Sequence, residues 1–319
     1  MNTSKTIARI AILGALTAAP AGADNVIPDA PSWSTPARTD VAGHEAGQGD
    51  LTVDGSDQSY TQVQIDDKFS APDWFPDQHL PMPETVQFGK GPKVWACASC
   101  HLTSGTGHPE SASLAGLDSA YMQAQMRAFS DGTRVDYSGH MNRMAALMTP
   151  EEIQTASDWF ASLTPRTFIE VIETETVPAS YIDSTRMRLL TEAEPREEPI
   201  AGRIIEIPVD PVQVKLRHPV SNFISYVPTG SIARGEALVS GDNDRTYACA
   251  GCHGDDLTGT EIAPVIIGNF GIYTVRQLHG FKSETRSSEE ASLMSDIVVD
   301  LTDQDIIDIA AYLSAQQIN

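Results

Sequence analysis

Cys97-Ala98-Ser99-Cys100-His101 and Cys249-Ala250-Gly251-Cys252-His253 are two copies of one pattern, and they decide the fold of this 319-residue chain. Each copy reads Cys-x-x-Cys-His, the attachment signature of a c-type haem. The two thiols can add to the two vinyl groups of one porphyrin, and the adjacent imidazole is then placed to ligate the iron. Because the two copies use all four cysteines, the sequence predicts two covalently bound haem c groups.

The same cysteine spacing also occurs in zinc sites and in thioredoxin-like redox pairs. A structural zinc ion would take both pairs into one four-thiolate site. Here a histidine follows each pair directly, and the pairs lie 152 residues apart, so we favour haem. The predicted attachment residues are Cys97, Cys100, Cys249 and Cys252, and the predicted proximal iron ligands are His101 and His253.

Residues 1–23 have the form of a secretory signal peptide. Lys5 and Arg9 precede and border an apolar run over residues 10–16, and Ala21-Gly22-Ala23 is a small-residue cleavage site. The apolar run is short for a membrane span, although an uncleaved anchor is the alternative. Covalent haem attachment takes place outside the cytoplasm. We therefore expect a periplasmic chain that is soluble or peripherally associated with membrane complexes.

The composition is strongly acidic, with 43 Asp and Glu against 21 Lys and Arg and a formal net charge of −22. Such a chain repels nucleic acid and is attracted to a protein with a basic patch, which accelerates encounter at low salt. We expect redox proteins as partners, bound through the acidic surface, and no nucleic acid.

The two haem regions align with each other as an internal repeat. A shift of 152 residues superimposes both motifs, and one extra residue then enters the second copy. The matched pairs are Gly116 with Gly268, Tyr121 with Tyr273, Gln125 with Gln277, Arg134 with Arg286, and Met141 with Met294. Each copy predicts a short helix (121–129 and 273–281) and an amphipathic terminal helix that begins after a capping threonine, Thr149 or Thr302. Loops are expected between the motif and these helices.

This repeat divides the chain into five segments: the signal peptide 1–23, an acidic and partly disordered segment 24–83, domain 1 over 84–165, an insertion 166–228, and domain 2 over 229–319. Residues 191–199 of the insertion are rich in Pro and Glu. Residues 168–177 and the alternating 212–217 read as strands. Residues 73–83, which include Trp74, are expected to cover part of domain 1.

The sixth iron ligand is chosen by register. Met294 is the only methionine after Cys249, and Met141 holds the matching position, so both are predicted iron ligands. The competitors are His140 in domain 1 and His279 in domain 2. Side chains expected to pack instead are Met122, Met126, Met144 and Met148. The remaining histidines are expected on the surface or in loops (His108 and His218) or outside both repeats (His44 and His79).

On these residues the chain resembles the tandem di-haem class I c-type cytochromes of bacterial periplasms. The resemblance covers about residues 91–163 and 230–315. It implies a mainly α fold with two class I cytochrome c domains in tandem, here joined by a Pro/Glu-rich insertion with short strands. It also implies that the carbonyl of Pro264 accepts a hydrogen bond from the proximal histidine Nδ1. Domain 1 departs from the family with Ala112 at that position, and domain 2 with Glu284 in place of a glycine.

The expected function is electron transfer between a dehydrogenase or quinol-linked donor and an oxidase or another cytochrome, with His/Met ligation at both irons and no enzymatic activity. A di-haem peroxidase is one alternative, but one of its haems must open a coordination site, whereas both copies here keep the same methionine position. The other alternative is a cytochrome subunit of a dehydrogenase complex.

Overall fold

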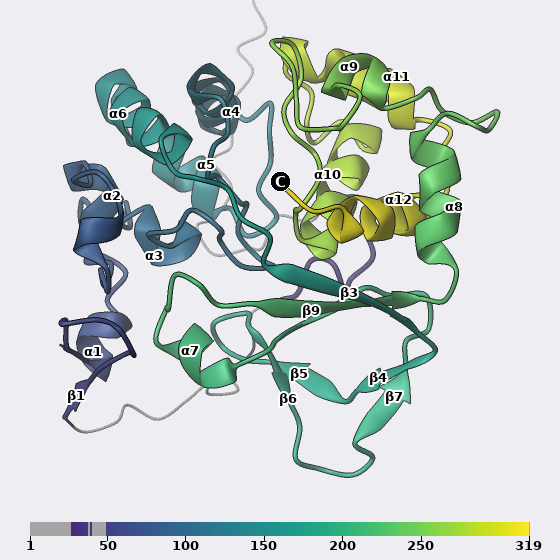
Figure 1. Cartoon of the computed structure of the whole chain (residues 1–319). Coiled ribbons are helices and arrows are strands. Elements are labelled where there is room, and N and C mark those ends of the chain that lie inside the picture. Colours follow the sequence, from purple (N-terminus) through teal and green to yellow (C-terminus); the bar gives the residue numbers. More distant parts are fainter. Residues whose placement is uncertain (1–26, 38, 40–48, 319) are drawn as a thin grey trace, which may run out of the picture.

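The computed structural model describes residues 27–37, 39 and 49–318, so the predicted signal peptide lies outside the described residues. Two groups of helices stand side by side, and a layer of strands runs beneath them (Figure 1). The left-hand group is domain 1, the right-hand group is domain 2, and the strands belong to the insertion. Within the described part of the chain, no helix is long and apolar enough to cross a membrane.

Domain 1 is built on the predicted short and terminal helices. Its helices are α2 (Glu84–Gln87), α3 (Ala98–His101), α4 (Ser119–Asp131), α5 (His140–Ala145) and α6 (Pro150–Ala161). The predicted cap is confirmed, because Thr149 Oγ1 accepts from the Glu152 backbone N–H and the Glu152 carboxylate accepts from that of Thr149. Helix α6 buries Trp159 and Phe160 in a core that also contains Met122 of α4.

Domain 2 repeats this arrangement and adds a longer first helix. Its elements are α8 (Ser231–Val239), α9 (Ala250–His253), α10 (Gly271–Lys282), the 3₁₀ turn η2 (Glu289–Ala291), α11 (Ser292–Val298) and α12 (Asp303–Ala315). Thr302 and Asp305 form the same capping box. Helix α8 was not predicted. It crosses α12 so closely that a Cβ on Gly235 would lie 2.0 Å from the carbonyl oxygen of Asp308.

The repeat also holds in backbone conformation. Gly116 and Gly268 have φ of 70° and 67°, in the left-handed region that favours glycine. A Cβ at either position would meet a residue just beyond the terminal helix, Pro165 or Ile318, within 3 Å. One sequence expectation is corrected in both copies: the segments with Met141 and Met294 are not loops but the short helices α5 and α11.

The insertion contains most of the strands. They are β3 (Ile169–Thr174), β4 (Thr176–Pro178), β5 (Ser180–Ile182), β6 (Arg188–Leu190), β7 (Glu197–Pro199), β8 (Ile205–Pro208) and β9 (Phe223–Pro228). Strand β9 lies between β3, which is parallel to it, and β8, which is antiparallel. The pairs β4–β7 and β5–β6 form two short ribbons. The strand expected over residues 168–177 is therefore present as β3 and β4.

The strand expected over residues 212–217 is wrong, because this segment forms helix α7 (Pro211–Lys215). Asp210 accepts hydrogen bonds from the backbone N–H groups of Val212 and Gln213, and Pro211 occupies the first helical position. These two residues are a helix start signal that outweighs a short alternation of apolar side chains.

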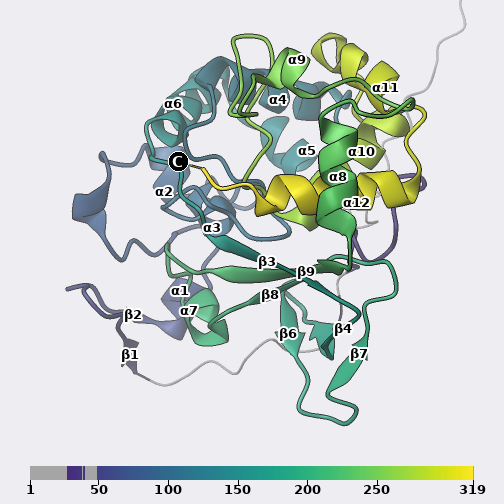
Figure 2. The same cartoon turned by 45° about the vertical axis from the view of Figure 1, so that its right-hand side comes forward.

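The insertion is fastened to both domains (Figure 2). The carboxylate of Glu206 on β8 is buried and accepts hydrogen bonds from the backbone N–H groups of Gly271 (2.6 Å) and Ile272 (3.4 Å), at the start of α10. On the other side, Arg217, two residues after the end of α7, donates a hydrogen bond to the carbonyl of Ser99, inside the first haem motif. The insertion therefore packs against both domains and is more than a flexible linker between them.

The segment before domain 1 is more closely attached than we expected. Its elements are β1 (Asp50–Leu51), β2 (Tyr60–Thr61), α1 (Gln62–Ile65) and the 3₁₀ turn η1 (Pro76–Gln78). Val53, Ile65 and Trp74 form a small buried cluster, and the Trp74 indole donates to the Leu216 carbonyl (2.8 Å). Residues 73–83 do cover part of domain 1, because the Trp159 indole donates to the carbonyl of Leu80 (2.9 Å).

Candidate functional site

Each haem motif forms a single helical turn that directs its functional side chains toward one cavity. The first cysteine precedes α3 or α9, and the histidine is its last residue. The cysteines and histidines of both motifs line the cavity: Cys97, Cys100 and His101 from domain 1 and Cys249, Cys252 and His253 from domain 2. The structure thus brings together the six residues that the motifs predict.

Both motif histidines are oriented by a backbone carbonyl eleven residues later. His101 Nδ1 lies 2.8 Å from the Ala112 carbonyl oxygen, and His253 Nδ1 lies 2.6 Å from that of Pro264. A carbonyl can only accept, so Nδ1 carries the proton and Nε2 keeps its lone pair for a metal. The absence of the family proline in domain 1 therefore leaves this contact unchanged.

Burial sets the protonation of these groups. It lowers the pKa of His101 and His253, which keeps both imidazoles neutral, as an iron ligand must be. Burial also raises the pKa of the Cys97 thiol to about 12 and that of Cys249 to about 11. A thioredoxin-like redox pair would instead need a lowered thiol pKa. Moreover, no group of three or more His, Cys, Asp and Glu among the described residues could hold a metal ion, so the cysteine pairs do not converge on one ion.

The cavity is one continuous space of about 1640 Å³ between the domains. A pocket for a single small ligand is typically about 300–1,000 Å³, so this cavity has room for more than one group. The insertion supplies part of the wall, through Met187, Val214, Arg217, His218 and Phe223. Sequence reasoning missed this contribution. His218 does lie in a loop, as expected, but its side chain is buried and packs edge-on against Phe75.

Lining of the cavity distinguishes some of the candidates for the sixth iron ligand but not all of them. Met141 on α5 and Met294 on α11 both line the cavity. His279 does not line it, and lies buried in α10 with its Nε2 3.9 Å from Asp303. His140 does line the cavity, and its ring lies 4.5 Å from that of Trp95. The other domain 1 methionines (Met122, Met126, Met144 and Met148) also line it, as does Met187 of the insertion, which the sequence did not suggest.

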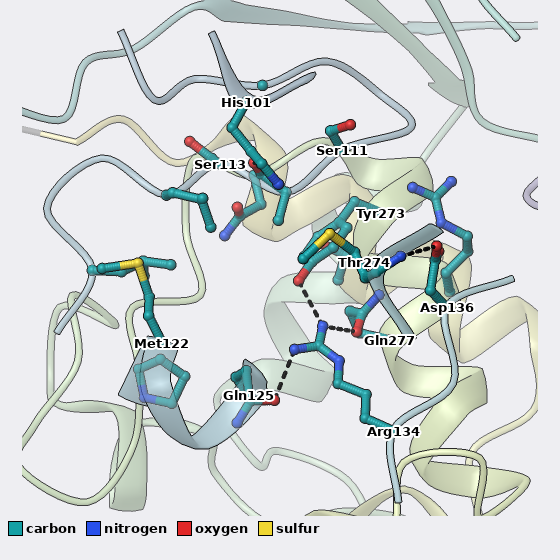
Figure 3. A pocket seen from close by; sticks show the side chains of 18 of the residues that line it. His101, Ser111, Ser113, Met122, Gln125, Arg134, Asp136, Tyr273, Thr274 and Gln277 are labelled. Atoms are coloured by element: carbon teal, nitrogen blue, oxygen red, sulfur yellow. Dashed lines mark hydrogen bonds between the residues drawn. The ribbon is translucent and has the colours of Figure 1, made fainter. Parts of the chain in front are cut away.

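Two arginines at matched positions, Arg134 and Arg286, line the cavity and join the domains. Figure 3 shows the contacts of Arg134. Arg134 donates to Gln125 of its own domain (2.7 Å) and to Gln277 (2.7 Å) and Tyr273 (3.1 Å) of the other. Arg286 makes the reciprocal set: it donates to Gln277 (3.2 Å), and across the interface to Gln125 (2.9 Å) and Tyr121 (3.0 Å).

The backbones around these arginines also pair. Val135 N–H donates to the Thr285 carbonyl, and Ser287 N–H donates to the Thr133 carbonyl, each at 2.7 Å. The interface is therefore pseudo-symmetric, with each domain giving the other the same contacts. This arrangement explains why arginine, glutamine and tyrosine recur in register in the sequence repeat.

The cavity fits two haem groups. Arg134 and Arg286 are both buried and line the cavity, yet neither lies within ion-pair distance of a carboxylate among the described residues. The buried Nε of Arg286 has no hydrogen-bond partner there. Buried guanidinium groups without a counter-charge are unfavourable, and a haem carries two propionate carboxylates that can supply it.

Comparisons with known proteins agree with this geometry. The cytochrome c family model matches residues 88–164 and 232–317, which together make up just over half of the chain. The chain is 24% identical to a thiosulfate dehydrogenase electron acceptor of Thiomonas intermedia, over 72% of this chain and 82% of that protein. It is 25% identical to a cytochrome c-552 of Acidithiobacillus ferridurans, over 69% and 73%. It is 32% identical to a cytochrome c4 of Pseudomonas aeruginosa, over 26% and 43%.

Two solved structures are among those to which this chain is similar. A cytochrome c4 of Acidithiobacillus ferrooxidans aligns with a TM-score of 0.44 and 23% identity, over 69% of this chain and 97% of that one. A thiosulfate dehydrogenase of Marichromatium purpuratum aligns with a TM-score of 0.47 and 23% identity, over 70% of this chain and 37% of that one.

Proposed function

The chain belongs to the cytochrome c family as a tandem protein with two covalently bound haem c groups, and we propose that it is a periplasmic di-haem electron carrier. Electrons enter from a dehydrogenase or quinol-linked donor and leave to an oxidase or another cytochrome. The observation that carries this proposal is the pair of matched haem sites on one cavity, joined at its centre by the reciprocal Arg134 and Arg286 contacts.

The chain's own residues prepare both sites for electron transfer. When bound, each haem supplies an iron that gains and loses one electron. Cys97, Cys100 and their counterparts hold the porphyrins, and the carbonyls of Ala112 and Pro264 fix the two proximal imidazoles. The buried arginines offset negative charge near the domain interface. Fixed ligands and buried counter-charges reduce the reorganisation that accompanies a change of oxidation state.

We assign Met141 and Met294 as the sixth ligands. Register supports this choice, since each methionine lies on the helix that precedes the terminal helix of its domain, and each lines the cavity. His140 is the competitor in domain 1. A thioether ligand raises the reduction potential, and a closed sixth position leaves no site for peroxide. This assignment therefore separates a carrier from a di-haem peroxidase.

For the donor we propose a soluble dehydrogenase that oxidises a small inorganic or organic substrate. The relative from Thiomonas intermedia, which matches 72% of this chain, is an electron acceptor of thiosulfate dehydrogenase. The strongly acidic composition supports partners with basic docking surfaces. The predicted signal peptide and the covalent haem attachment support the periplasm as the compartment.

A redox titration followed by visible and near-infrared spectra tests the proposal. We expect two low-spin haems, each with the thioether-to-iron charge-transfer band in the ferric state. Met294→His should lower one potential by on the order of 100 mV and leave the other nearly unchanged, because axial ligands dominate haem potentials. Met141→His should do the reverse. A high-spin haem with rapid peroxide turnover would contradict the carrier function, and an unchanged pair of potentials would contradict the ligand assignment.

A further inference from the structure

The two haem motifs have the same conformation but differ in exposure. In motif 1, Ala98 is 2% exposed and Ser99 is 4% exposed. In motif 2, the counterpart Ala250 is half-buried, and Gly251 and Cys252 are exposed. A difference this large between matched segments must come from what lies over them.

Motif 1 is covered by two contacts that do not recur over motif 2, one from the N-terminal segment and one from the insertion. The Ala96 N–H donates to the Lys68 carbonyl (2.8 Å), whereas the bond from the Cys97 N–H to the Thr85 carbonyl of α2 has its counterpart in the bond from the Cys249 N–H to the Val239 carbonyl of α8. From the other side the guanidinium of Arg217 reaches the Ser99 carbonyl. In Figures 1 and 2, α3 lies between α2 and strand β3, whereas α9 lies at the outer edge of the molecule.

Large apolar side chains surround motif 2 and are open to solvent. Tyr247, Ile262 and Leu293 are 75%, 82% and 70% exposed, and all three border the cavity that contains Cys252. Thr246 Oγ1 donates to the Ile297 carbonyl of α11 (3.3 Å), which joins the segments of Tyr247 and Leu293, and Thr260 Oγ1 donates to the Cys252 carbonyl (2.7 Å), which holds the Ile262 loop against motif 2. We call Tyr247, Gly251, Cys252, Ile262 and Leu293 the motif-2 face. Exposed apolar side chains grouped in this way are typical of interaction sites.

The matched positions in domain 1 are occupied and covered. Trp95, the counterpart of Tyr247, lies under the cations of Lys68 (4.5 Å) and Arg143 (5.1 Å). Glu110, the counterpart of Ile262, is hydrogen-bonded to Tyr137 and lies 3.6 Å from Arg276. The apolar group is therefore a property of domain 2 alone.

The charges around the motif-2 face are acidic. Asp244, Asp255, Asp256, Glu261, Glu290 and Asp296 are all exposed there. The nearby base Arg245 is held by Asp305 at 2.8 Å, so it offsets little of this charge. An apolar group with an acidic rim is complementary to an apolar patch with a basic rim.

We propose that the motif-2 face is the docking site for a redox protein whose own apolar patch is ringed by lysines and arginines, and that Lys68 and Arg217 close the equivalent face of domain 1. The inference rests on the proposed electron-transfer function and adds to it the single face through which such a partner exchanges electrons. Its two supports are the difference in exposure between matched motifs and the complementarity of charge.

Stopped-flow kinetics with the holoprotein tests this, with a basic mitochondrial-type cytochrome c as the probe. Ile262→Lys and Leu293→Lys should each lower the second-order rate constant about tenfold at low ionic strength, because they place a like charge in the contact. Val63→Lys is the matched control. It adds the same charge at a 73% exposed apolar position on α1, and should change the rate less than about twofold.

Amide chemical-shift mapping gives an independent readout. On addition of the probe, shifts should concentrate in residues 244–262 and 289–296 and be absent from residues 95–101. Equal slowing by Val63→Lys, shifts at motif 1, or no shifts at all would each overturn the docking proposal. Oxidation of both haems by ferricyanide needs no docking face. If that oxidation proceeds while the mapping fails, the docking proposal alone is wrong. If the haems do not cycle at all, the proposed function is wrong.

Discussion

Domain 1 and domain 2 have the same haem-binding skeleton, but their surroundings differ. Both fix the proximal histidine by a carbonyl eleven residues later, and both begin the terminal helix with a capping box. Around domain 1, however, the N-terminal segment and the insertion cover the motif, whereas domain 2 keeps an exposed apolar face and has the longer helix α8. Haem binding is thus determined locally, while access to each haem is determined by segments outside the repeat.

The largest expected difference between the two domains is in electron exchange, and it should follow when one haem motif is removed at a time. Cys249→Ser with Cys252→Ser and Cys97→Ser with Cys100→Ser should each halve the haem content, measured as the pyridine haemochrome. Only the first pair should abolish electron exchange with the basic cytochrome c probe, because it removes the haem at the proposed docking face. If the domain 1 pair abolished exchange and the domain 2 pair did not, the two faces would have the opposite roles.

The close crossing of α8 and α12 belongs to domain 2, and a substitution there tests how much the crossing contributes to stability. Gly235→Ala would place a methyl group 2.0 Å from the Asp308 carbonyl oxygen, so the helices must move apart. We expect a loss of about 3 kcal/mol in the free energy of unfolding, measured by urea denaturation of the holoprotein. Gly251→Ala is the control. It meets nothing within 4 Å, and should change stability by less than about 0.5 kcal/mol. An equal loss in both variants would show that the crossing is not the cause.

The parts that could be predicted from the sequence are the parts that repeat. The motifs predicted two histidines that both line the cavity, and the alignment located helices α4 and α10. The alignment also singled out Arg134 and Arg286, although their contacts with each other's domain appear only in three dimensions. A pattern that occurs twice at one spacing constrains both copies, and this is why these predictions hold.

The structure of the insertion, which does not repeat, could be predicted only in part. Residues 212–217 alternate like a strand, but Asp210 and Pro211 start a helix, and that signal was present in the sequence. The contact between Arg217 and Ser99 was not, because it joins residues 118 apart and depends on how the sheet packs beneath both domains. For the same reason the wall that the insertion gives the cavity could not be inferred from local patterns.

The smallest expected effect concerns Glu206, which fastens the insertion to domain 2. Burial raises its pKa to about 7, although the N–H groups of Gly271 and Ile272 favour its charged form. A carboxyl whose pKa is higher in the folded than in the unfolded chain stabilises the fold fully below about pH 4.5, and this stabilisation is lost as the pH rises through 7. Glu206→Gln stays neutral and should therefore become more stable than wild type as the pH rises.

We expect the difference between Glu206→Gln and wild type to grow by on the order of 2–3 kcal/mol between pH 4.5 and pH 8, since each unit of pKa shift corresponds to about 1.4 kcal/mol. Urea denaturation of the holoprotein at several pH values measures it. Glu170→Gln removes a carboxylate that is exposed on β3 and is the matched control, with no such growth expected. A parallel pH dependence in all three proteins would mean that Glu206 is already ionised in the fold, with the helix N-terminus outweighing its burial.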